Sequence, residues 1–413
     1  MKFKIITILF AISLSLSANK PLKIGVIADP HFLSEKLMDD NYAVDSYIAS
    51  SGKNIKVVPK VLDQVLKSYE QSVPDILLIN GDMTKDGERQ SHLDLVAKLK
   101  PLQDKGTRVF VVPGNHDINM PNSVQYVGNK TIPTANVSPD EFVEIYKNCG
   151  YGNALKRDTA SLSYVAKLDE NTWLLTIDVA RYKEYKDRSL SSGKLSPQTE
   201  QWVVDVLTEA HDNNIEVIGM MHWGLVEHIM FQSMFFKDYL VQDWQRLASL
   251  FADLGMKAIF TGHFHSNDIT AYTSAASNTI YDIETGTLSA YPFAYRTIEY
   301  SKGSMDIKTQ NVKSVPDYPN LADNNKKEML LLAKKMADQK LKSSGYNLSD
   351  SVRTKMADAI AQLFVLHLAG DEQLTPDLEQ AILEMAKTMD APVDLDDLEL
   401  DFAPADNNVI LDF

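Results

Sequence analysis

The sequence predicts an α/β core over residues 22–310, followed by a helical region at the C-terminus. Up to residue 310, short apolar runs alternate with stretches of helical periodicity, which is the pattern of strand–helix–strand units. After Ser314-Val315-Pro316 only helical periodicity continues. The length of 413 residues, with 44% hydrophobic and 23% charged residues, suits a globular protein of two domains. We expect these domains to cover residues 22–314 and 317–413.

The core is expected to contain several strands with helices between them. Strands are predicted for residues 23–28, 75–79, 108–112, 172–179, 216–221 and 257–261. Helices over residues 58–69 and 91–100 would connect the first three strands. These connections are long enough for the crossovers that join parallel strands.

The C-terminal region shows three helical segments. They cover residues 326–341, residues 351–368 before Gly370, and a third helix that starts at Pro376 behind Thr375 as N-cap. The third helix repeats its apolar residues at intervals of four, three and four: Leu378, Ile382, Met385 and Met389. An acidic segment follows, with Asp394, Asp396, Asp397, Glu399 and Asp401. It is either a solvated tail or a lid over a cationic centre, or it contacts another subunit.

The first 17 residues are typical of a secretory signal. Lys2 and Lys4 precede a mainly apolar stretch of twelve residues, 5–16, and small residues follow near Ser17. This run is shorter than the roughly 20 residues that span a bilayer. The alternative is an ordinary first strand or helix. We expect an exported bacterial protein, periplasmic or secreted, with no membrane span after removal of the signal.

Charge and cysteine content limit the classes of partner. With 41 basic and 56 acidic residues the net charge is −15, which argues against binding to polymeric nucleic acid or anionic membranes. Cys149 is the single cysteine, so no disulfide forms within the chain. We expect it to be a half-buried small residue and not a nucleophile.

Residues with metal-binding side chains follow five of the predicted strands. They form the segments Asp29-Pro30-His31, Gly81-Asp82, Gly114-Asn115-His116-Asp117, His222 and Gly262-His263-Phe264-His265. In open α/β sheets the ligand site lies beyond the carboxyl ends of the strands. Placed at one edge of one sheet, these side chains would converge.

These residue types suit a site with two metal ions. Imidazole with carboxylate and amide oxygens favours Fe, Zn, Mn or Ni. A single carboxylate, such as that of Asp82, can bridge two ions about 3.5–4 Å apart through its two oxygens. Two ions at this distance can hold a hydroxide between them and bind the oxygens of a phosphoryl group. Each motif alone is weak, and a lone His222 is more often structural. Together and in this order they form a strong signal.

The motif series DxH, GD, GNHD, H and GHxH resembles that of the calcineurin-like metallophosphoesterase superfamily. Asp29-Pro30-His31-Phe32 and residues 112–119 are most similar to secreted bacterial phosphoesterases with a helical C-terminal domain and to class III cyclic-nucleotide phosphodiesterases. The resemblance implies a four-layer αββα sandwich with a small helical C-terminal domain. It also implies two metal ions of the Fe, Mn or Zn type.

The resemblance also implies a role for each motif residue. Asp29, His31 and His265 would bind the first metal and Asp82 would bridge. Asn115, His222 and His263 would complete the second metal site. His116 would steady the phosphoryl group and protonate the leaving oxygen, and Asp117 would orient its imidazole. His228 is an alternative to His222.

The function expected from these features is hydrolysis of small phosphodiesters, of nucleotide type, by a metal-bridging hydroxide. The alternatives are a phosphomonoesterase or nucleotidase and a non-catalytic, partner-binding scaffold of the same fold. Five aromatic residues could stack a nucleobase or only pack the site walls: Phe32, Trp223, Phe264, Tyr291 and Tyr295. Arg181, Arg188 and Arg296 could contact a phosphate or be ordinary surface residues.

Overall fold

The computed structural model describes residues 20–39, 42–343, 348–388 and 400–413. The predicted signal segment lies outside the described residues. So do Met389 and, within the acidic segment, Asp394, Asp396, Asp397 and Glu399.

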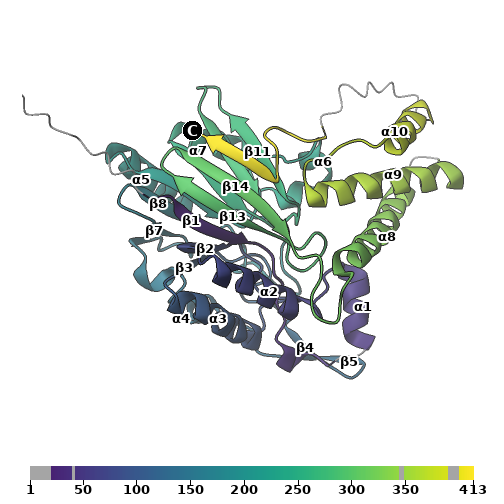
Figure 1. Cartoon of the computed structure of the whole chain (residues 1–413), viewed down its shortest axis with the longest axis horizontal. Coiled ribbons are helices and arrows are strands. Elements are labelled where there is room, and N and C mark those ends of the chain that lie inside the picture. The colour runs from purple at the N-terminus through teal and green to yellow at the C-terminus, as the bar shows by residue number, and fades with distance from the viewer. Residues whose placement is uncertain (1–19, 40–41, 344–347, 389–399) are drawn as a thin grey trace, which may run out of the picture.

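Two mixed sheets form the centre of the molecule (Figure 1). The first has six strands in the order β15-β14-β13-β1-β2-β3. Its strands β1, β2 and β3 are parallel, and β13, β14 and β15 continue it with antiparallel pairing. Their bounds are β1 Leu22–Ile27, β2 Ile76–Ile79, β3 Arg108–Val111, β13 Ala294–Ser301, β14 Ser304–Asn311 and β15 Asn408–Asp412.

The second sheet has seven strands in the order β11-β12-β10-β9-β8-β7-β6. Its centre, β12-β10-β9-β8, is parallel, and the outer strands pair antiparallel. The bounds are β6 Lys156–Arg157, β7 Tyr164–Lys167, β8 Thr172–Ile177, β9 Glu216–Met221, β10 Met256–Thr261, β11 Asp268–Thr273 and β12 Thr279–Glu284. Strands β4 (Val124–Val127) and β5 (Lys130–Pro133) form a separate hairpin.

Alternating side chains of the second sheet pack in two directions. Ile218 and Phe260 belong to the core that includes the residues of the first sheet, whereas Val217 and Ile259 pack with the residues of α5 (Pro197–Asp212) and α7 (Trp244–Asp253). On the other side, α2 (Val58–Gln71) and α3 (Arg89–Asp104) supply core residues next to β1, β2 and β3. The order of layers is helices, sheet, sheet, helices, so the predicted αββα sandwich is confirmed.

The helical C-terminal region lies at one end of the two sheets, beside α1 (Figure 1). It consists of α8 (Leu321–Ser343), α9 (Asp350–Ala369) and α10 (Pro376–Thr388). Gly52, directly after α1 (Tyr42–Ser51), packs against α8, because a Cβ there would lie 2.9 Å from Leu332 Cδ2. The remaining helices are α4 (Pro139–Ile145) and α6 (Gln232–Phe235), with short 3₁₀ turns at Glu35–Leu37, Tyr151–Asn153 and Lys237–Tyr239.

All six predicted strands form, with their ends within two residues of the expected positions. The third C-terminal helix starts as predicted, and the Thr375 hydroxyl accepts from the Leu378 amide at 3.3 Å. Strand β15 was not predicted: after the helical region the chain returns and pairs with β14 along the edge of the first sheet. In the described residues, no helix is both long enough and apolar enough to cross a membrane.

Strand β15 allows a stability test with two adjacent residues. Leu411 is 2% exposed and packs in the main core, whereas Ile410 on the opposite face is 65% exposed. We expect Leu411→Ala to lower the free energy of unfolding by about 2–5 kcal/mol and Ile410→Ala to change it by less than about 0.5 kcal/mol. Urea unfolding of both variants measures this. Equal effects would show that β15 does not pack as described.

Candidate metal centre

The expected metal ligands meet where the carboxyl ends of strands from both sheets come together. Asp29 and His31 follow β1, and Asp82 and Asn115 follow β2 and β3 of the first sheet. The other three ligands come from the second sheet: His222 follows β9, and His263 and His265 follow β10. The expectation of one edge of one sheet was therefore wrong, because the parallel parts of two facing sheets end at the same place.

Three of these side chains form the first group. His31 Nε2 lies 3.2 Å from His265 Nε2, and His265 Nε2 lies 3.3 Å from Asp29 Oδ1. The third distance, from His31 Nε2 to Asp29 Oδ1, is 3.9 Å. Three ligand atoms at this spacing can contact one ion.

A second group forms around the carboxylate of Asp82. Its ligand atoms, with those of His222 and His263, lie within 4.8 Å of one another. Asp82 Oδ2 is 3.4 Å from His222 Nε2 and 3.6 Å from His31 Nε2, so this oxygen lies between the two groups. That is the position expected of a bridging carboxylate.

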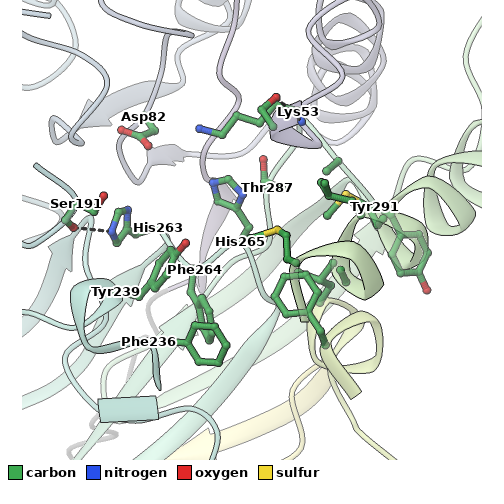
Figure 2. A pocket seen from close by; sticks show the side chains of 18 of the residues that line it. Lys53, Asp82, Ser191, Phe236, Tyr239, His263, Phe264, His265, Thr287 and Tyr291 are labelled. Atoms are coloured by element: carbon green, nitrogen blue, oxygen red, sulfur yellow. Dashed lines mark hydrogen bonds between the residues drawn. The ribbon is translucent and has the colours of Figure 1, made fainter. Parts of the chain in front are cut away.

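Hydrogen bonds to carbonyl oxygens set which ring nitrogens remain free. His222 Nδ1 donates to the carbonyl oxygen of Asn80 at 2.7 Å, so that in the neutral ring Nε2, which faces Asp82, is the nitrogen that can bind a metal. His263 Nε2 donates to the carbonyl oxygen of Ser191 at 2.9 Å (Figure 2). In the neutral ring, Nδ1 of His263 is then the nitrogen that can bind a metal.

The backbone around the ligands is strained. Five of them have positive φ angles that non-glycine residues rarely adopt: Asp29 (48°), His31 (44°), Asp82 (43°), His263 (73°) and His265 (71°). Each such residue costs of order 1–3 kcal/mol, and this strain typically gathers at functional sites. Two glycines let the backbone lie close to the ligand carboxylates. A Cβ on Gly114 would lie 2.2 Å from Asp82 Oδ1, and one on Gly262 would lie 2.4 Å from Asp29 Oδ2.

The donor set fits metal ions. Asp29 Oδ1, Asn115 Oδ1 and His222 Nε2 are buried without a hydrogen-bond partner, which is costly unless an ion contacts them. Burial disfavours the charged form of His222, but the carboxylates of Asp82 and Asp29 outweigh this and raise its pKa to about 9. The site thus carries negative charge that attracts a cation.

His116 lies beside this cluster and is held by a different acid from the one expected. Its Nδ1 is 2.7 Å from Asp86 Oδ1, and its Nε2 is 4.0 Å from Asp82 Oδ2. The carboxylate of Asp117 instead accepts from the amides of Gly114 (2.8 Å) and Thr84 (3.0 Å). The expected contact between Asp117 and the His116 imidazole is therefore wrong. Asp86 lies only four residues after Asp82 in the sequence, and this position could have indicated it as the partner of His116.

Lys53 was also missed by the sequence analysis. Its ammonium lies 3.3 Å from His116 Nε2 and 3.4 Å from His31 Nδ1, and Figure 2 shows it extended toward Asp82. No motif marks it, because it lies between two motifs in a segment without a regular pattern. His228, the alternative to His222, is elsewhere: its Nδ1 contacts Asp268 Oδ1 at 2.6 Å.

A cavity of about 230 Å³ opens beside the cluster (Figure 2). Lys53, Asn115, His116 and His265 lie on its polar side. Of the five expected aromatic residues, Phe264 and Tyr291 line it, whereas Phe32, Trp223 and Tyr295 are buried in the interior. Phe236, Tyr239 and Phe364 are further aromatic residues in its wall.

The arginines and the cysteine are not part of this cavity. Arg296 is fully buried and donates to carbonyl oxygens of Asp406 and Glu284, so neither of its expected roles holds. Arg181 pairs with Glu184, and Arg188 is exposed. Cys149 is fully buried instead of half-buried, and burial raises the pKa of its thiol to about 12, which disfavours the reactive thiolate at neutral pH.

Comparison with known families agrees with this geometry. The sequence model of the family described as calcineurin-like phosphoesterase matches residues 22–267, more than half of the chain. The chain belongs to the calcineurin-like phosphoesterase family. As a member of that family it is a metal-dependent hydrolase of phosphoric esters, a class that uses a dinuclear metal centre.

One solved structure supports the fold, and a second has a lower similarity. A dimetal phosphatase from Danio rerio has 14% identity and a TM-score of 0.51, covering 71% of this chain and 97% of its own. A purple acid phosphatase from seeds of yellow lupin, Lupinus luteus, has 11% identity and a TM-score of 0.43, covering 70% of this chain and 51% of its own. A search of curated proteins found no match to this sequence.

The close approach of Gly114 to Asp82 gives a test of the metal centre. We expect Gly114→Ala to reduce bound metal, since the new Cβ must displace the Asp82 carboxylate. Gly224→Ala is the matched control, because a Cβ there meets no atom closer than 3.5 Å. Elemental analysis of both purified variants after incubation with Mn²⁺ gives the metal content. Wild-type metal content in Gly114→Ala would contradict the placement of Asp82.

Proposed function

We propose that this phosphoesterase hydrolyses small phosphodiesters at a dinuclear centre of Fe, Mn or Zn type. The observation that carries the proposal is the position of His116, held by Asp86 at the edge of a cavity whose floor is the ligand cluster. A general acid beside a two-metal site is the arrangement that ester cleavage at phosphorus requires.

The first metal would be held by Asp29, His31 and His265, with Asp82 shared. The second would be held by Asp82 together with Asn115, His222 and His263. When bound, such ions lower the pKa of coordinated water towards about 7 and stabilise charge on the phosphoryl oxygens.

The chain's own side chains supply the remaining chemistry. His116 lines the cavity, and its Nε2, the ring nitrogen not held by Asp86, would give its proton to the departing alkoxide oxygen. Asp86 accepts from His116 Nδ1 and fixes the ring with Nε2 toward the substrate. Lys53 would attract a negatively charged phosphoryl oxygen, since its ammonium lies between His116 and His31.

Two features favour a diester over the phosphomonoesterase alternative. Among the described residues that line the cavity, Lys53 is the one lysine or arginine, and burial lowers the pKa of its ammonium. The side chains of the cavity thus offer at most one such positive charge, which suits a monoanion better than a dianion. The wall opposite the ligands is apolar and aromatic, and it provides space for the second alcohol of a diester. Nucleotide diesters are one such class, because Phe264 and Tyr291 could contact a base.

We also propose that residues 1–17 are a signal peptide, so that the mature enzyme acts outside the cytoplasm. The support is the order of charged, apolar and small residues.

The central test is metal-dependent turnover. We expect the protein to hydrolyse bis(p-nitrophenyl) phosphate with Mn²⁺ present, and to lose this activity in EDTA and in Asp82→Ala. The same protein should be assayed on p-nitrophenyl phosphate and on 2′,3′- and 3′,5′-cyclic nucleotides. Turnover of the monoester alone would favour the phosphatase alternative. No turnover with both metals bound would favour the scaffold.

The position of Asp86 is tested by three variants. With a cyclic nucleotide, whose leaving group is an alkoxide, we expect His116→Asn to lower kcat roughly 10²–10⁴-fold while the metal content stays unchanged. Asp86→Asn should lower kcat by a smaller factor than His116→Asn does. Asp117→Asn should lower the free energy of unfolding and leave kcat nearly unchanged. Steady-state kinetics with metal analysis of each variant decide this. A larger loss of kcat in Asp117→Asn than in Asp86→Asn would contradict the geometry.

A further inference from the structure

The cavity beside the metal ligands has a continuous apolar wall made by two C-terminal helices. On α8 the wall residues recur at helical spacing: Met329, Leu332, Ala333 and Met336. On α9, Phe364 and Leu368 are one helical turn apart and face the same cavity. One face of each helix therefore covers the metal centre with side chains that neither donate nor accept strong hydrogen bonds.

A second, mostly apolar cavity lies next to the first. It has a volume of about 260 Å³, and it shares Phe236 and Phe364 with the cavity at the metal centre. Most of its other lining residues are apolar: Ile229, Met230, Phe231, Ile360, Leu363 and Leu400. The two cavities thus follow one another from the ligands along α9.

The wall has a defined position relative to the metal ligands. The ring of His367 on α9 packs against Phe264, the residue between His263 and His265, with ring centres 5.2 Å apart. His367 Nδ1 also contacts Glu372 Oε1 at 2.6 Å. These contacts hold α9 beside the motif loop.

We propose that the substrate is a phosphodiester in which one alcohol carries a long aliphatic chain, with the chain lying along α8 and α9 in the two cavities. This inference rests on the proposed phosphodiesterase function and names its substrate class. The phosphate would lie at the ligands and Lys53. The chain would pass Phe236 and Phe364 into the second cavity.

A nucleobase fits this wall less well than an alkyl chain does. The polar edge of a base would lose its water against Met329, Leu332 and Phe364 without a replacement partner. Each unpaired group weakens binding roughly tenfold or more. A methylene buried at the same place strengthens binding about fourfold.

The surface next to the second cavity is also apolar. Phe231, which lines that cavity, is 56% exposed, and Met234 and Phe235 in the same segment are 68% and 53% exposed. Large apolar side chains grouped on a surface usually mark a binding site. They provide an apolar path by which a chain can enter.

The test uses alkyl p-nitrophenyl phosphates with methyl, butyl, octyl and dodecyl chains, each below its micelle concentration and with Mn²⁺ present. Water oxygen bonds to phosphorus, the bond from phosphorus to the aryl oxygen breaks, and p-nitrophenolate leaves with the electron pair. The alkyl phosphate remains and a proton goes to solvent. We expect kcat/KM to rise about fourfold per methylene until the space is filled, through a lower KM at similar kcat.

Two variants on adjacent residues of α8 locate the effect. Leu332→Gln places an amide in the wall and should remove most of the dependence of kcat/KM on chain length. Leu331→Gln is the matched control, since Leu331 is 68% exposed and lines neither cavity. In the second cavity, Ile360→Gln should lower the rate for the dodecyl ester and leave the butyl ester unchanged.

The outcomes separate this inference from the proposed function. If the methyl ester is hydrolysed but kcat/KM does not change with chain length, the inference is overturned and the diesterase stands. The same holds if thymidine 5′-(p-nitrophenyl) phosphate is a better substrate than the octyl ester, or if Leu331→Gln flattens the chain dependence as much as Leu332→Gln. If none of the esters is hydrolysed, the proposed function fails and the inference with it.

Discussion

The arrangement of the whole chain depends on keeping two buried carboxylates, Asp29 and Asp82, close to the same group of imidazoles. Neither carboxylate has appreciable access to water, and His31 and His222 lie within 3.9 Å of both. Such a cluster is unfavourable without cations, because like charges and unpaired acceptors are held together at low dielectric. The two sheets, the strained loop residues and the glycines beside them all hold this unfavourable group in place. Bound cations would offset the unfavourable free energy of the cluster.

Much of this could be predicted because each ligand follows a strand that is easy to recognise. β2 is an unbroken apolar run, Ile76-Leu77-Leu78-Ile79, and all four residues are buried, as expected of a strand covered on both faces. The motif residues come directly after such runs, so their convergence follows from the parallel strand directions. That they come from two sheets could be inferred only from the resemblance, since local patterns do not show which strands pair.

Other features could not be predicted because they depend on packing between distant segments. Nothing in the sequence around Lys53 indicates that its ammonium reaches His116, and Arg296 resembles an ordinary surface arginine until the sheets enclose it. Asp86 and Asp117 illustrate the same point. Both are near His116 in the motifs, but the turn that follows β3 directs Asp117 to the backbone amides of Thr84 and Gly114. Which carboxylate contacts the imidazole of His116 can therefore be decided only from the three-dimensional structure.

The return of the chain to β15 has a consequence for movement of the helical region. The region is attached at both ends to the same sheet, through β14 before α8 and through β15 after residue 400. A segment tethered at both ends to neighbouring strands has less freedom to move away from the cavity than a flap that is held at one end. A chain ending at residue 316 would lose an edge strand as well as the helices. It would also expose the free edge of β14, and unpaired strand edges promote aggregation.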